Sequence, residues 1–142
     1  VVALGAGILR GMGAGDNLRA MYLTRSISEI SSLSILLGGR RETCFGLAGV
    51  GDLIVTCFSE HSRNQRAGFY IGQGEIVDEA LRHVGAAVEG YYAADSIEHL
   101  ARELRIDMPI CSAIYRVLYK GHSAAKEIAP LMRRAGFSEF RQ

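Results

Sequence analysis

The sequence has little of what defines several large protein classes. It contains only three cysteines, Cys44, Cys57 and Cys111, an odd number set far apart among apolar residues. This spacing predicts buried thiols in a reducing compartment, and it excludes a disulfide framework or a zinc site. No apolar run reaches the roughly 18 to 20 residues that span a bilayer. We therefore expect a cytoplasmic protein without a metal ion and without a membrane segment.

Neither sign of charge dominates the sequence. Sixteen Lys and Arg residues stand against 15 Asp and Glu, for a formal net charge of +1. No basic stripe is interleaved with aromatic residues, so nucleic-acid binding has little electrostatic support. The 142 residues are 49% hydrophobic and 22% charged, which is typical of one globular domain with its own core.

The apolar pattern is helical almost throughout. Asp16 and Asn17 are good N-caps for a long amphipathic helix, and Pro109 suits the first turn of another. No segment shows the alternation typical of strands. The sequence therefore predicts one all-α domain over residues 1–142. The expected helices cover residues 18–37, 42–47, 76–84, 91–104, 109–121 and 123–134, with a turn or extended joint at 88–90.

The first residues raise two further points. Residues 1–8 are apolar, with no initiator Met, no basic flank and no small-residue cleavage site. They are therefore not a signal peptide, and we expect the chain to be part of a longer protein. The glycine pairs at 5–7 and 11–13 superficially match a dinucleotide fingerprint. Because no βαβ unit follows, close packing of backbones is the favoured interpretation.

The most informative segment places isolated polar groups in apolar, glycine-rich surroundings. Asp52 stands within the run 46–57, and Ser62-Arg63-Asn64 follows shortly after it. A carboxylate in such a run is costly to bury unless it is paired, and the guanidinium fork of Arg63 suits a phosphate or a carboxylate. The alternative is structural, with Asp52 capping a helix and Arg63 pairing with it.

Two other sets of polar residues were considered for a site. The four histidines, 61, 83, 99 and 122, are too scattered for metal-ligand spacing, and a surface or capping role is expected for each. Glu89 lies in the small-residue joint 86–90. Its carboxylate could cap the following helix or accept hydrogen bonds from a ligand, and both interpretations stay open.

At least five motifs follow one another along the chain. These are GAGDN at 13–17, GLAGVGDLIVTC at 46–57, SRN at 62–64, VEG at 88–90, and MPI at 108–110 with YRVLY at 115–119. Taken together, they resemble the C-terminal half of a known family, the bacterial-type NAD(P)-dependent glycerol-3-phosphate dehydrogenases. The resemblance covers nearly the whole chain and keeps the order and spacing of these motifs.

The resemblance implies a helical domain of the 6-phosphogluconate dehydrogenase C-terminal-like type. An N-terminal Rossmann domain, absent from this chain, would bind NAD or NADP. The complete enzyme, a homodimer, would interconvert dihydroxyacetone phosphate and sn-glycerol 3-phosphate for phospholipid synthesis. In the family the acid/base lysine lies just before the segment that matches 1–3, so this chain alone is expected to be inactive.

The resemblance also implies roles for individual residues. Asp52 matches the aspartate that orders the lysine and the substrate hydroxyl, which is the catalytic role expected in this chain. Ser62, Arg63 and Asn64 match the substrate-binding triplet, and Arg63 would be shared between the substrate phosphate and the cofactor. The remaining two assignments are Thr56 as a hydroxyl donor near the phosphate, and Ala87 with Glu89 as cofactor contacts.

The sequence leaves two alternative functions open. The first is a non-catalytic helical interaction domain, in which the glycines serve helix packing and Ser62-Arg63-Asn64 only caps a helix. The second is the substrate domain of a related dehydrogenase that acts on another small hydroxy acid or sugar acid.

Overall fold

The computed structural model of this chain describes residues 1–133 and is helical. No β-strand occurs in this part of the chain, so the predicted all-α fold is confirmed there. The elements, in chain order, are α1 (Val2–Gly11), α2 (Asp16–Leu36), α3 (Arg41–Cys44), the π-helix η1 (Leu47–Gly51), α4 (Asp52–Phe58), α5 (Arg63–Gly72), α6 (Val77–Val84), α7 (Glu89–Leu104), α8 (Pro109–Lys120) and α9 (Ala124–Arg133).

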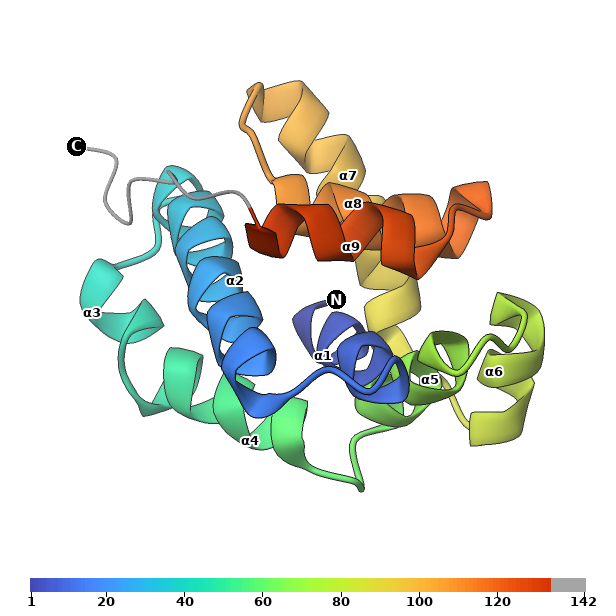
Figure 1. Ribbon diagram of the computed structural model, residues 1–142. Helices are drawn as coiled ribbons and strands as arrows, with labels where there is room; N and C mark the ends of the chain where they lie inside the picture. The colour runs from blue at the N-terminus through green and yellow to red at the C-terminus, as the bar shows by residue number, and fades with distance from the viewer. Residues whose placement is uncertain (134–142) are drawn as a thin grey trace.

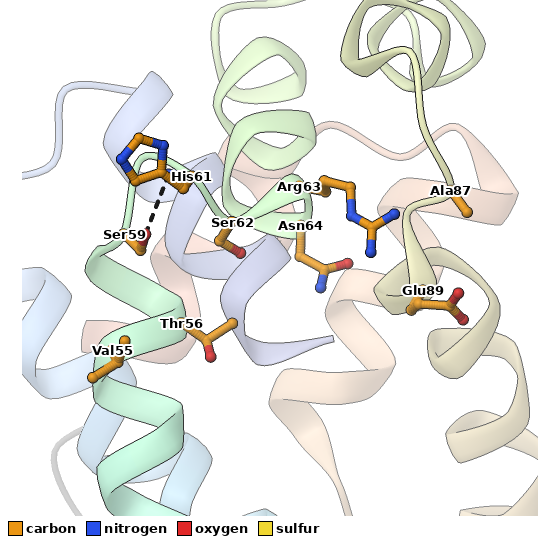
Figure 2. A pocket seen from close by; sticks show the side chains of 9 residues that line it. All are labelled: Val55, Thr56, Ser59, His61, Ser62, Arg63, Asn64, Ala87 and Glu89. Carbon is orange, nitrogen blue, oxygen red and sulfur yellow. Dashed lines mark hydrogen bonds between the residues drawn. The ribbon is translucent and has the colours of Figure 1, made fainter.

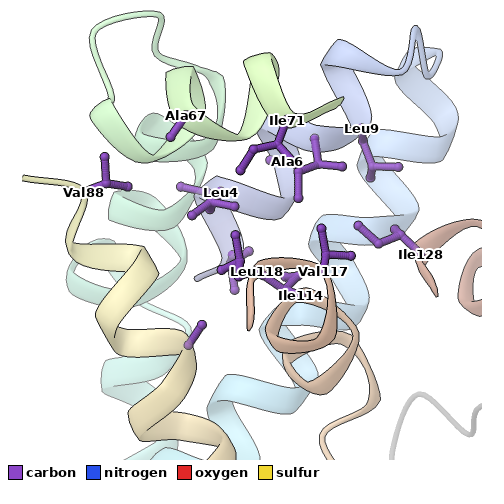
Figure 3. Packing of buried hydrophobic residues seen from close by; sticks show 14 of the residues in the cluster. Leu4, Ala6, Leu9, Ala67, Ile71, Val88, Ile114, Val117, Leu118 and Ile128 are labelled. Atoms are coloured by element: carbon purple, nitrogen blue, oxygen red, sulfur yellow. The ribbon is translucent and has the colours of Figure 1, made fainter. Parts of the chain in front are cut away.

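Helix α1 lies at the centre of the molecule (Figure 1), and it contacts α2, α4, α5 and α7. Its apolar side chains are buried from Val2 to Leu9. Figure 3 shows Leu4, Ala6 and Leu9 of α1 among apolar side chains of α5, α8 and α9. The apolar segment predicted at residues 1–8 is therefore the helix on which the other helices pack.

Glycines bring α1 and α5 into backbone contact. A Cβ on Gly68 would overlap the carbonyl oxygen of Leu4, and a Cβ on Gly72 would overlap that of Ile8. In the other direction, a Cβ on Gly7 would overlap the carbonyl oxygen of Gln65. The contacts advance along both helices together, so the two helices run in the same direction with their first turns side by side. Packing, not dinucleotide binding, accounts for the early glycines.

The helix boundaries correct several predictions. The N-cap of α2 is Gly15 and not Asp16, which is the first helical residue and pairs with Arg19 at 3.2 Å. The helix predicted at 42–47 is a single turn, α3, after which the chain enters η1. The predicted joint at 88–90 is shorter than expected, because α7 already begins at Glu89.

Other boundaries are confirmed. Helix α6 closes on Gly85 in the left-handed conformation (φ 71°), and α8 begins at Pro109 and closes on Gly121 (φ 66°). Helix α9 begins at Ala124, close to the predicted start. The predicted end of that helix at residue 134 lies outside the described residues.

The first turn of α8 is capped by a side chain from another helix. The carboxylate of Glu29, on α2, accepts hydrogen bonds from the backbone N–H groups of Ile110 (2.7 Å) and Cys111 (3.2 Å). Burial raises the pKa of Glu29 from its ordinary value of 4.5 to about 7, against the opposing effect of these bonds. A second carboxylate, Glu98 of α7, accepts a 2.7 Å bond from Ser112.

No single helix within residues 1–133 is long and apolar enough to cross a bilayer. The segments 41–58 and 63–72 together have sufficient length and apolar composition, but the chain bends by 49° between them.

Candidate functional site

A cleft of about 360 Å³ opens where the end of α4 meets the first turns of α5 and α7. Figure 2 shows its side chains, which come from two segments that are separate in the sequence, 55–64 and 87–89. Six of the seven predicted site residues line it, and only Asp52 does not. The lining residues are Val55, Thr56, Ser59, His61, Ser62, Arg63, Asn64, Ala87 and Glu89.

The predicted triplet forms the beginning of α5. Ser62 is the N-cap, and its Oγ accepts a hydrogen bond from the backbone N–H of Gln65 at 3.3 Å. The capping role considered for this triplet is therefore confirmed for Ser62. The preference of serine for this position explains why the helix begins here, with Arg63 as its first residue.

Arg63 is exposed and has no hydrogen bond or ion pair within residues 1–133. Its guanidinium extends across the cleft toward the segment that carries Ala87 and Glu89 (Figure 2). The pairing of Arg63 with Asp52, which was the structural alternative, does not occur. The planar fork of donors is thus free to bind an anion.

Asn64 joins the two helices that meet at the cleft. Its Oδ1 accepts a hydrogen bond from the backbone N–H of Gly90, in the first turn of α7, at 2.7 Å. A Cβ on Gly90 would lie 2.6 Å from Asn64 Oδ1 and 3.0 Å from the backbone nitrogen of Val1. The first turns of α1, α5 and α7 therefore converge at one end of the cleft.

Thr56 and Asp52 lie on successive turns of α4. The hydroxyl of Thr56 lines the cleft and donates a 2.8 Å hydrogen bond to the carbonyl oxygen of Asp52. Asp52 is exposed, begins α4 and caps no helix with its side chain. The π-helix η1 leads directly into it, and Gly49 there packs so closely on the carbonyl oxygen of Cys44 that a Cβ would overlap it.

The end of α4 and the start of α5 form two walls of the cleft, and the joint between α6 and α7 forms the third. Ala87 is exposed, while Val88 beside it is buried and serves as the N-cap of α7. Glu89 is the first residue of α7 and is exposed at the cleft. Val88 is the N-cap and has no polar side-chain atom, and the Glu89 carboxylate makes no hydrogen bond within residues 1–133, so the capping interpretation of Glu89 does not apply.

The arrangement suits an anionic ligand. The first turns of α5 and α7 begin at the cleft with the positive ends of two helix dipoles, and Arg63 adds a full positive charge. Hydroxyls of Thr56 and Ser62 lie beside it. Glu89 supplies an acceptor at the opposite side, so a ligand with both an anionic group and hydrogen-bond donors is favoured.

Three residues of the cleft were missed by sequence reasoning. Val55 and Ser59 flank Thr56 on and after α4, and His61, assigned a surface or capping role, lies at the cleft with its backbone N–H bonded to Ser59 Oγ at 3.2 Å. Their proximity in sequence to Thr56 and Ser62 was the available signal.

Metal-ion and thiol chemistry find little support in the structure. Among the described residues, no group of three or more His, Cys, Asp or Glu is placed to hold a metal ion. Cys57 and Cys111 are buried as predicted, but Cys44 is only partly buried. Burial raises the pKa of the Cys57 thiol to about 11, which keeps it protonated and unreactive at neutral pH.

The chain matches known proteins over nearly its whole length. Residues 1–129 match the family model described as "NAD-dependent glycerol-3-phosphate dehydrogenase C-terminus". It is 49% identical over 140 residues to glycerol-3-phosphate dehydrogenase [NAD(P)+] of Lacticaseibacillus casei, covering 99% of this chain and 40% of that protein. The corresponding protein of Syntrophomonas wolfei is 48% identical over 134 residues, covering 94% of this chain and 39% of its own length.

A solved structure agrees with the sequence comparison. The crystal structure of glycerol-3-phosphate dehydrogenase from Coxiella burnetii superposes with a TM-score of 0.91 at 37% identity, covering 94% of this chain and 41% of that one. The chain thus spans about two fifths of the length of its relatives. It belongs to the NAD-dependent glycerol-3-phosphate dehydrogenase family, as the C-terminal domain of that family.

Proposed function

We propose that this chain is the substrate-binding and dimerising domain of a cytoplasmic NAD(P)-dependent glycerol-3-phosphate dehydrogenase, with residues 1–142 as one domain. The complete enzyme interconverts dihydroxyacetone phosphate and sn-glycerol 3-phosphate and supplies phospholipid synthesis. NAD or NADP is bound mainly by the N-terminal domain of that enzyme. The observation that carries the proposal is the unpaired guanidinium of Arg63 among hydroxyls at two helix N-termini.

The six predicted residues that line the cleft have separate tasks in this reaction. Arg63, with the first turn of α5, binds the substrate phosphate, and Thr56, Ser62 and Asn64 add polar contacts. Anchoring the phosphate fixes the reacting carbon in place, which lowers the entropic part of the barrier. The nicotinamide, when bound, supplies the hydride chemistry. Ala87 and Glu89 line the side of the cleft that would contact the cofactor.

Asp52 acts through a residue outside this chain. We propose that its carboxylate orders the acid/base lysine that lies just upstream of the matched segment in the family. The convergence of Val1 with Asn64 and Gly90 supports this, because a residue preceding Val1 would enter beside the cleft. Without that lysine and the Rossmann domain, the chain alone is inactive.

The test restores the complete enzyme. Residues 1–142 are joined to the N-terminal portion of the Lacticaseibacillus casei relative, and NADH oxidation is followed with dihydroxyacetone phosphate. Arg63→Ala should raise the KM for this substrate about 100-fold, because a charge-assisted, bidentate contact is lost. Arg66→Ala is the matched control, since Arg66 lies one turn further along α5 and does not line the cleft.

Three results would reject the proposal. An active assembly whose kinetics do not change in Arg63→Ala would remove the phosphate-binding role. A folded, cofactor-binding assembly without activity toward dihydroxyacetone phosphate would favour a related dehydrogenase with another substrate. If neither glycerol 3-phosphate nor inorganic phosphate shifts its melting temperature, a non-catalytic interaction domain becomes the better interpretation.

A further inference from the structure

The hydrogen bond between Asn64 and Gly90 decides which atom of the Asn64 amide remains for a ligand. Gly90 is the second residue of α7, so its backbone N–H lies in the first turn and has no acceptor within the helix. Asn64 Oδ1 accepts a hydrogen bond from this N–H at 2.7 Å. In an amide only the oxygen accepts hydrogen bonds, so this contact places Oδ1 toward α7 and leaves Nδ2 on the other branch of the side chain.

The Nδ2 group of Asn64 faces the cleft. Asn64 is half-buried and lines the cleft, and its Nδ2 has no hydrogen-bond partner within residues 1–133. In Figure 2 its oxygen lies on the side of Glu89, while its nitrogen points into the space between Thr56 and Glu89. An amide nitrogen has two donors and no acceptor. Asn64 therefore offers a ligand only N–H groups.

Glycine at position 90 is what permits this orientation. A Cβ there would lie 2.6 Å from Asn64 Oδ1 and 3.0 Å from the backbone nitrogen of Val1. The first contact is too close, but the atom that must move is the end of a side chain. Gly90 does not have a positive φ, so alanine adds no backbone strain. Gly90→Ala should therefore keep the fold and displace the Asn64 amide.

We infer that Gly90 is a positioning residue, which holds the Asn64 amide with its nitrogen toward the cleft so that the site selects an acceptor oxygen of the ligand. The identity of that oxygen rests on the proposed function and is an oxygen of the substrate phosphate. A fully ionised phosphate offers only acceptors, and Arg63, the neighbour of Asn64, also carries only donors. The opposite orientation would place the amide oxygen against the phosphate and repel it.

The test is a double-mutant cycle in the complete, joined protein that tests the proposed function. The four proteins are the parent, Gly90→Ala, Asn64→Ala and the double variant, and kcat/KM for dihydroxyacetone phosphate is measured for each. We expect Gly90→Ala to lower kcat/KM about 10-fold in the parent, because a hydrogen bond to a charged group is lost. In the Asn64→Ala background its effect should be below about 2-fold, because the amide through which it acts is gone.

Two further variants separate a positioning role from a structural one. Gly15→Ala is the matched control, since Gly15 is exposed and a Cβ on it would meet no described atom within 4 Å. It should leave kcat/KM unchanged. Asn64→Asp keeps an acceptor for the Gly90 N–H and replaces Nδ2 with an oxygen. It should keep the melting temperature close to that of the parent and lower kcat/KM at least as much as Asn64→Ala.

Two outcomes of the cycle would overturn the inference. An equal loss from Gly90→Ala in both backgrounds would mean that the glycine acts independently of Asn64. A higher KM for NADH in Gly90→Ala, with kcat/KM for dihydroxyacetone phosphate unchanged, would place its effect in the neighbouring Glu89.

A binding measurement distinguishes failure of this inference from failure of the proposed function. Inorganic phosphate is added to the same four proteins, and the rise in melting temperature is recorded. If the parent is inactive but phosphate stabilises it, and Gly90→Ala reduces that rise only when Asn64 is present, the inference stands and the proposed function fails. If the parent is active and the cycle is additive, the inference fails alone. An inactive parent that phosphate does not stabilise would overturn both.

Discussion

Two glycine-rich regions of this chain have similar composition and different structural roles. Between α1 and α5, the glycines let the backbones of two helices touch, and the surrounding apolar side chains are buried. In the segment 46–51, Gly49 packs only against the neighbouring turn at Cys44, a Cβ on Gly51 would come no nearer to another atom than 3.3 Å, and Leu47 is exposed. Glycine and apolar residues in a sequence therefore do not say whether a segment builds the core or borders the site.

The difference has a functional consequence. The tight α1–α5 pair holds the first turns of α1 and α5 side by side, and the cleft forms at that end. On the more exposed flank formed by η1 and α4, α4 supplies Val55 and Thr56 to the lining of the cleft. A rigid base with a less packed functional edge is common in proteins, because binding requires surface that is not already used in packing.

The largest effect should come from filling the space between α1 and α5. Gly68→Ala places a Cβ onto the carbonyl oxygen of Leu4, a backbone atom that cannot move away without shifting a helix. We expect a loss of more than about 3 kcal/mol in the free energy of unfolding, or no folded protein. Urea denaturation measures it. A loss below about 1 kcal/mol would show that the two helices are not locked together.

A second prediction tests the buried carboxylate on the densely packed side. The folded-state pKa of Glu29, about 7, lies above its ordinary value of 4.5. The folded state therefore keeps a proton that the unfolded state has released. Stability should fall as pH rises from about 4.5 to 7, by up to about 3 kcal/mol.

Glu29→Gln removes this titration. Denaturation of both proteins at several pH values between 4.5 and 7.5 should show a flatter stability profile for the variant. The cleft does not include Glu29, so ligand binding at constant pH should change little. Parallel profiles for the two proteins would contradict the prediction.

A smaller effect is expected where α5 of the tight helix pair meets α7. Asn64→Ala leaves the N–H of Gly90 without its 2.7 Å partner and should cost about 1 to 2 kcal/mol. Asn64→Asp keeps an acceptor oxygen and should recover most of that loss. Melting curves of the three proteins make the comparison, and equal losses in both variants would mean that the bond to Gly90 contributes little.

The smallest effect should come from the segment 46–51. Gly51 has helical backbone angles (φ −60°, ψ −51°), and the nearest atom to a Cβ there would be the flexible end of the Leu47 side chain, at 3.3 Å. Because alanine is favoured over glycine in helices, Gly51→Ala should stabilise the fold by up to about 1 kcal/mol. Chemical denaturation measures the free energy of unfolding of Gly51→Ala, and the same measurement on Gly68→Ala gives the comparison between the two regions. A large loss here would erase the distinction between the two regions.

The local features of the fold were predictable. Helical periodicity, Pro109 at a helix start and glycines at helix ends depend on neighbouring residues, and the structure confirms them. The errors arose where the chain leaves ordinary α-helix. The π-helix at 47–51 has no distinctive pattern, and the start of α7 at Glu89 follows from the burial of Val88, which only packing decides.

In the site, too, some features depend on neighbouring residues and others depend on tertiary packing. The sequence by itself determined that Ser62 caps a helix, that Arg63 follows it, and which residue types bind an anion. Only the tertiary structure decided that Asn64 meets Gly90, that Ala87 and Glu89 close the cleft, and that Glu29 caps α8 from a helix 81 residues away. The conformational preferences of a short segment depend on residues that are neighbours in the sequence. The contacts listed here join residues that are distant in the sequence, so they depend on how the helices pack around α1 and α5.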